Sequence, residues 1–112
     1  MLPKFQRLNL KIDFKWVASG KKIDTKFATL FIKTGDNSTA RVGIAISAAR
    51  FKKANQRNRA KRLLSQALQS IYQKLPQTLN IVALPKVGIL KVKSAEVLKD
   101  LGNVLKDEKI ID

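Results

Sequence analysis

An apolar stripe at helical spacing runs from Ala60 to Leu75, and it constrains the fold more than any other feature of the sequence. Apolar side chains recur three or four positions apart through this segment, which is the pattern of an amphipathic helix. Pro76 sets the limit of that helix. A helix with one apolar face has to bury it, so we expect another layer of structure against Ala60, Leu63, Leu64, Ala67, Leu68, Ile71 and Leu75.

The part of the chain before this helix predicts one short helix and at least two strands. Asn9 is suited to cap a helix that Ser19-Gly20 stops. Residues 27–33 and 41–47 are rich in aromatic and β-branched side chains, which is typical of strands. Because the turn-forming residues 35–38 separate the two strands, we expect them to pair as an antiparallel hairpin.

The part after the helix predicts one buried strand and one further helix. Residues 80–84 are a short apolar run typical of a buried strand, and residues 87–92 fit either a strand or an apolar connecting loop. Ser94 is positioned to cap the last helix. With a further strand expected in residues 21–26, the order is α-β-β-β-α-β-α, an α+β sandwich, and residues 1–112 are predicted to form a single domain.

The charge of the chain is strongly positive and unevenly distributed. There are 23 lysines and arginines against 8 aspartates and glutamates, a formal charge of +15. Residues 37–95 contain 12 basic residues and no acidic one, whereas residues 96–112 carry a net charge of −2. Self-repulsion of this size destabilises a compact state and is typical of a chain with a polyanionic partner. We therefore expect a nucleic acid to bind mainly to the middle of the chain.

The residue types that are absent exclude several kinds of chemistry. The chain has no histidine and no cysteine, so it has no imidazole base, thiol nucleophile, disulfide or thiolate zinc site. No apolar run approaches the length of a membrane span, and residues 1–5 lack the apolar core of a secretory signal. The expected location is the cytoplasm, without a membrane partner.

The densest basic cluster lies between Arg50 and Arg62, where seven of thirteen residues are basic. It covers a loop and the first turns of the main helix. Arginine guanidinium groups bind phosphate oxygens in pairs, and the positive end of a helix adds free amide donors. A basic cluster of this kind can also be a solvated helix face. The lack of any carboxylate in the segment favours a polyanion backbone as its ligand.

This cluster also carries a family resemblance. Residues 57–62, Arg-Asn-Arg-Ala-Lys-Arg, resemble the RNR motif of the bacterial ribonuclease P protein subunit. Other parts of the chain are similar to that family in the same order: residues 2–4 with 7–8, residues 13–14 followed by 20–21, residues 41–47, and residues 75–76 through 81–83. The ten-residue step from Ser47 to Arg57 resembles the proteobacterial form of the loop before the motif. The resemblance implies a sandwich with a left-handed β-α-β crossover, an exception to the usual right-handed rule.

The resemblance implies a function in tRNA 5′-end maturation without catalytic residues in the protein. In this family a large RNA, using Mg²⁺ that the RNA binds, removes the 5′ leader of precursor tRNA, and the protein binds both RNAs as part of the endonuclease. No metal ligand on the protein and no obligate protein partner are expected. The residues implied to contact the catalytic RNA are Arg50, Lys52, Lys53, Arg57, Asn58, Arg59, Lys61 and Arg62.

A second site implied by the resemblance is a cleft between sheet and helix that holds the single-stranded leader. Unpaired bases stack on aromatic rings there, while basic side chains follow the backbone. The matching positions are Phe14, Phe31, Ser47 and Lys86. A phenylalanine in a strand or helix is more often part of the core, which is the competing interpretation for both rings. The chain departs from the family pattern at Ala18, which replaces a second aromatic residue, and at Ala48-Ala49, which replaces two basic ones.

Two other classes of function remain to be compared. A ribosomal or general RNA-binding protein is compatible with the charge alone. A protein-only, metal-dependent nuclease needs clustered carboxylates, and Asp13, Asp24 and Asp36 show no paired spacing that suggests a two-metal site.

Overall fold

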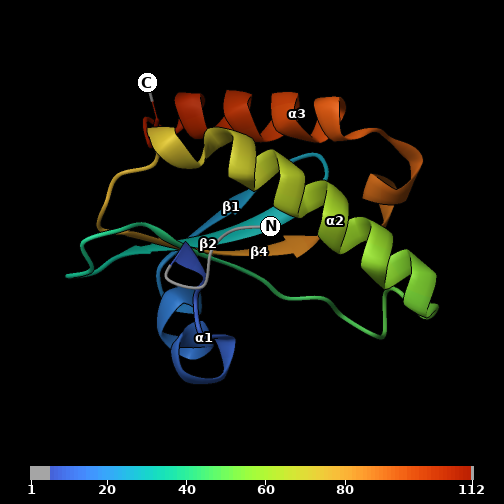
Figure 1. The fold of residues 1–112 in the computed structure, drawn as a ribbon, viewed down its shortest axis with the longest axis horizontal. Helices are drawn as coiled ribbons and strands as arrows, with labels where there is room; N and C mark the ends of the chain where they lie inside the picture. The colour runs from blue at the N-terminus through green and yellow to red at the C-terminus, as the bar shows by residue number, and fades with distance from the viewer. Residues whose placement is uncertain (1–5, 112) are drawn as a thin grey trace.

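A four-stranded sheet lies between two helices on one face and a single helix on the other (Figure 1). The computed structural model describes residues 6–111. The elements follow in the order α1 (Leu10–Ala18), β1 (Lys21–Asp24), β2 (Ala28–Thr34), β3 (Arg41–Ile44), α2 (Ala54–Ile71), the 3-10 helix η2 (Tyr72–Lys74), β4 (Leu79–Pro85), the 3-10 helix η3 (Val87–Lys91) and α3 (Ser94–Asp107). The predicted α+β sandwich and its element order are confirmed.

The strands lie in the order β1-β2-β4-β3, so the predicted hairpin between β2 and β3 is wrong. β2 is antiparallel to β1 on one side and to β4 on the other. β3 is parallel to β4, with Val42 opposite Ile81, and α2 connects the two strands in the chain. The predicted β-α-β unit is therefore present, and its left-handed sense stays a prediction.

Burial explains why β4 takes the position between β2 and β3. Six of its seven residues are buried, and a strand that is apolar on both faces is most stable in the interior of a sheet. Side-chain amides hold the loop after β2 against the start of β4. The Asn80 Nδ2 group donates to Asn37 Oδ1 at 2.9 Å, and Asn37 Nδ2 donates to the Gln77 carbonyl at 2.9 Å. The turn-forming residues therefore fasten the loop to β4 and do not close a hairpin.

The main core lies between the sheet and the pair α2 and α3, which pack side by side above it (Figure 1). The predicted stripe is buried throughout: α2 contributes Ala60, Leu63, Leu64, Ala67, Leu68 and Ile71, and Leu75 follows in the chain. The helix itself ends at Ile71, before the position that Pro76 suggested. A smaller apolar cluster lies on the opposite face, where α1 packs on the sheet.

The predicted N-cap residue is correct for α1 and wrong for α3. Asn9 caps α1 as predicted, because its Oδ1 accepts a hydrogen bond from the Lys11 amide at 3.2 Å. Ser94 does not cap α3; it is the first helical residue, and the extended residue before it is Lys93, which makes no side-chain cap. Residues 87–91 form the 3-10 helix η3, which connects β4 to α3, so the strand alternative for this segment is wrong. Within residues 6–111, no helix has both the length and the hydropathy of a membrane span.

Candidate nucleic-acid interface

The basic cluster of residues 50–62 forms a surface at the N-terminal end of α2. The loop before the helix exposes Arg50, Lys52 and Lys53, and the helix exposes Asn58, Lys61 and Arg62. The first turn of α2 contains no acidic residue that would neutralise the helix N-terminus. The amide donors of the first turn and these cations therefore lie in the loop before α2 and in the N-terminal half of the helix.

Arg57 and Arg59 differ from the other basic residues of the cluster because both are half-buried and bonded to the protein's own backbone. Arg57 Nη1 donates to the carbonyls of Phe51 at 2.8 Å and Lys52 at 3.2 Å. Arg59 donates from Nε to the Leu90 carbonyl and from Nη2 to the Val92 carbonyl, both at 3.3 Å. A guanidinium has five N–H donors, so each arginine keeps donors for a phosphate. These two residues fasten the loop and η3 to α2.

Few of the cations have an acidic partner. Among residues 6–111 there are two ion pairs, Lys21 with Glu108 at 2.8 Å and Lys86 with Asp24 at 3.5 Å. The hydrogen bond from Thr29 and the neighbouring lysines lower the pKa of the exposed Asp24 carboxyl. The cations of residues 50–62 take part in neither pair, so their charge is available to an external anion.

This excess of charge predicts that anions stabilise the free protein. We expect sulfate to raise the unfolding temperature above that in sodium chloride of equal ionic strength, because an anion that binds only the folded state contributes about 2.7 kcal/mol at 100 times its Kd. Circular dichroism during heating measures the shift. The Lys52→Ser, Lys53→Ser variant should gain less from sulfate, and an equal gain would assign the effect to the general action of sulfate on protein surfaces.

A second concave surface lies on the α1 side of the sheet and has a volume of about 330 Å³. Phe31 and Ser47, two of the predicted leader-site residues, both line this cleft. Arg50 of the basic cluster lines it too. The structure thus joins the two predicted surfaces at Arg50. The complete lining is Lys22, Thr29, Phe31, Ala45, Ser47, Arg50, Leu84 and Pro85.

The other two predicted leader-site residues lie outside the cleft lining. Phe14 is half-buried and belongs to the small apolar cluster that also contains Phe31 and Val82. Lys86 follows Pro85, and its Nζ donates to the Thr25 carbonyl at 2.8 Å. Phe14 therefore packs in the same apolar cluster as Phe31. The Lys86 side chain is instead held at the end of β4 by the Thr25 carbonyl and by its ion pair with Asp24.

Two polar residues of the cleft, Lys22 and Thr29, were not identified from the sequence. Lys22 pairs with Phe31 across β1 and β2, and Thr29 pairs with Leu84 across β2 and β4. Side chains of directly paired residues lie on the same face of a sheet. The alternation of exposed and buried side chains within residues 21–34 indicates which of them share a face of the sheet. Assigning Thr29 to the cleft also requires knowing that β4 pairs with β2.

Carboxylates do not form a metal site in the part of the chain that the structure describes. No group of three or more aspartate, glutamate, histidine or cysteine residues is close enough to bind one ion together within residues 6–111. Asp13 and Asp36 line one polar hollow, and Asp24 lies away from them on β1. These residues do not fit a protein-held Mg²⁺ pair, which needs several oxygen ligands at one point.

The fold and these surfaces define a class: a small basic α+β protein with a cationic helix end beside a cleft that has an aromatic wall. A model of the family described as Ribonuclease P matches residues 2–109. The ribonuclease P protein component of Chlamydia muridarum is 37% identical over 109 residues, covering 93% of this chain and 90% of that protein. The one from Legionella pneumophila strain Lens is 37% identical over 89 residues, covering 79% and 75%. The match to the one from Pseudoalteromonas atlantica covers 64% of that protein's length.

Solved structures agree with the sequence comparisons. The RNase P protein of Thermotoga maritima superposes with a TM-score of 0.78 at 26% identity, covering 89% of this chain and 97% of that one. An RNase P protein of Staphylococcus aureus has the same fold, with a TM-score of 0.83 and coverage of 96% and 92% at 18% identity. The chain belongs to the bacterial ribonuclease P protein family.

Proposed function

We propose that the chain is the protein subunit of ribonuclease P and takes part in removing the 5′ leader of precursor tRNA in the cytoplasm. The observation that carries this proposal is the family match over residues 2–109 together with the exposed, unpaired cations at the start of α2. The catalytic RNA of the enzyme is the proposed partner of those cations, and precursor tRNA is the proposed substrate.

The surface formed by residues 50–62 would hold the catalytic RNA through its backbone. Each cation that neutralises a phosphate releases a counterion, which makes binding strong at low salt and weak at high salt. Exposed Lys52, Lys53 and Arg62 can approach phosphates freely, while Arg57 and Arg59 present their remaining donors from fixed positions. The Asn58 amide can add hydrogen bonds to phosphate or sugar oxygens.

The cleft beside Phe31 would hold the single-stranded leader. Stacking of a base on an aromatic ring contributes about 1–3 kcal/mol to binding. Lys22 and Arg50, which line the cleft, can contact the phosphates of the strand. Because Arg50 belongs to both surfaces, a leader in the cleft would lie next to the catalytic RNA. The cations between them would offset the repulsion of two phosphate backbones.

The protein is not proposed to carry out the cleavage. The chain has no histidine or cysteine, and its described carboxylates do not gather into a metal site. Mg²⁺ bound by the catalytic RNA would supply the chemistry of phosphodiester hydrolysis. The role of this chain is then to bind and position both RNAs.

Competition binding separates this proposal from that of a general RNA-binding protein. Labelled catalytic RNA from the same organism is bound to the protein, and unlabelled 5S ribosomal RNA or unlabelled catalytic RNA is added at the same nucleotide concentration. We expect the catalytic RNA to compete at least about tenfold better, since a built site adds specific contacts to the non-specific phosphate term. Equal competition by 5S ribosomal RNA would favour the general RNA-binding protein.

A further inference from the structure

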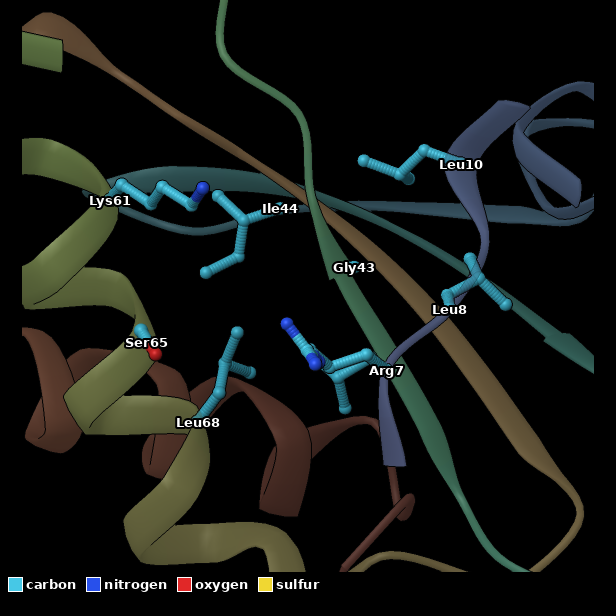
Figure 2. A pocket seen from close by; sticks show the side chains of 9 residues that line it. Arg7, Leu8, Leu10, Gly43, Ile44, Lys61, Ser65 and Leu68 are labelled. Carbon is cyan, nitrogen blue, oxygen red and sulfur yellow. The ribbon is translucent and has the colours of Figure 1, made fainter. Parts of the chain in front are cut away.

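A small pocket lies at the β3 edge of the sheet, between the segment before α1, the strand β3 and the middle of α2. Figure 2 shows Arg7 and Lys61 reaching toward this pocket from opposite walls, with Ile44 between them. The pocket is lined by Arg7, Leu8, Leu10, Val42, Gly43, Ile44, Lys61, Ser65 and Leu68.

The N-terminal segment forms one wall because it pairs with the edge of β3. The Leu8 amide donates to the Val42 carbonyl at 3.0 Å, and Arg7 bridges to Val42 as in a parallel sheet. Gly43 permits the close packing: a Cβ atom at this position would come within 2.8 Å of Leu10 Cδ2. The leucines and Ile44 thus give the pocket an apolar interior.

The polar groups of the pocket favour an anion. Its lining contains two cations and the Ser65 hydroxyl and no carboxylate. Neither Arg7 nor Lys61 belongs to the ion pairs of residues 6–111. A pocket that combines apolar side chains with two cations and a hydroxyl matches a ligand that has an apolar ring and a phosphate group.

The volume of the pocket limits the size of the ring that it can hold. Its volume is about 160 Å³. An apolar cavity of about 150 Å³ accommodates one benzene ring. One six-membered ring fits this space, whereas the fused rings of a purine would extend out through its open side. Sequence-specific proteins read RNA chiefly through unpaired bases that leave the stack, so a single extruded base is the natural form of such a ligand.

We propose that this pocket binds one unstacked pyrimidine nucleotide of the catalytic RNA, with the base against Ile44 and the phosphate between Arg7 and Lys61. The proposal rests on the proposed function for the identity of the RNA. It adds a base-reading contact to a surface otherwise expected to bind the phosphate backbone alone. Lys61 then serves this pocket as well as the surface of residues 50–62.

Nuclear magnetic resonance of the free, full-length protein tests the pocket with uridine and cytidine monophosphate as probes. We expect both nucleotides to shift the methyl signals of Ile44 in a saturable way, and ribose 5-phosphate, which lacks the base, to leave those methyl signals in place. Ser65→Leu should abolish the shifts by filling the pocket. Ser70→Leu, at an exposed serine of the same helix, should retain them. Absent methyl shifts, equal shifts with ribose 5-phosphate, or shifts that persist in Ser65→Leu would overturn the proposal.

Binding measurements with the catalytic RNA test whether the nucleotide in the pocket belongs to that RNA. Ser65→Leu should bind that RNA about tenfold more weakly than Ser70→Leu, as expected for the loss of one base contact. Equal affinities of the two variants would contradict a pocket for this RNA. A protein that takes up the nucleotides but fails to assist the catalytic RNA would refute the proposed function and leave the nucleotide site standing. A protein that assists the RNA but takes up no nucleotide would refute the pocket alone.

Discussion

Replacing both Arg57 and Arg59 with alanine is expected to weaken binding of the catalytic RNA on the order of 10- to 100-fold, because each side chain supplies charge-assisted hydrogen bonds. The slope of log affinity against log salt should fall by up to about 2, at roughly 0.9 per lost phosphate contact. The same variant should also unfold several degrees lower, since four hydrogen bonds to backbone carbonyls are lost. Salt-dependent RNA binding and thermal unfolding measure the two effects.

A pair of exposed cations from the same surface provides the control. Lys52→Ala with Arg62→Ala removes the same formal charge without removing any contact to the protein's own backbone. This variant should lose RNA affinity and salt slope and keep its unfolding temperature. If both pairs lowered the unfolding temperature equally, the fastening role of Arg57 and Arg59 would be wrong. If replacing Arg57 and Arg59 lowered the unfolding temperature but left RNA affinity unchanged, the proposed RNA contact of these two arginines would be wrong.

Replacing the two aromatic rings predicted for the leader site should reduce the preference of the ribonucleoprotein for precursor over mature tRNA. In Phe14→Leu and Phe31→Leu the apolar cluster keeps an apolar side chain of related size, but a base loses its stacking partner. We expect the preference to fall about tenfold for a ring that stacks a base, within the 1–3 kcal/mol range for such contacts. Equilibrium binding of both tRNA forms to the assembled enzyme measures the ratio.

Phe27→Leu is the matched control for the rings. Phe27 is also half-buried, but it packs against the main core on the other side of the sheet. Its replacement should affect stability and leave the preference for precursor tRNA at the wild-type value. A preference that stayed at the wild-type value in Phe14→Leu and Phe31→Leu as well would remove both rings from the leader site.

The helices could be predicted from the sequence because their signals are local. The stripe of α2 requires only that Ala60, Leu64 and Ile71 lie on one side of a helix, and all three are buried. Strand pairing is not local: nothing in residues 27–47 indicates that β4 lies between β2 and β3. The place of β4 depends on the burial of both its faces and on the contact between Asn37 and Asn80.

The candidate sites were predictable in composition and not in geometry. Residues 50–62 could be identified as a basic surface because no acid interrupts them. The internal bonds of Arg59 to Leu90 and Val92 join positions 31 and 33 residues apart, so they depend on the folded chain. Similarly, Arg7 and Lys61 meet at one pocket only because the segment before α1 pairs with β3.

Cleavage of precursor tRNA by the reconstituted enzyme tests the central claim most directly. The purified protein is added to the catalytic RNA of its own organism across a series of magnesium concentrations. The account predicts that the protein raises the rate of 5′-leader removal at low magnesium and cleaves nothing without the RNA. Cleavage by the protein alone, or an RNA activity that the protein leaves unchanged at every magnesium concentration, would contradict it.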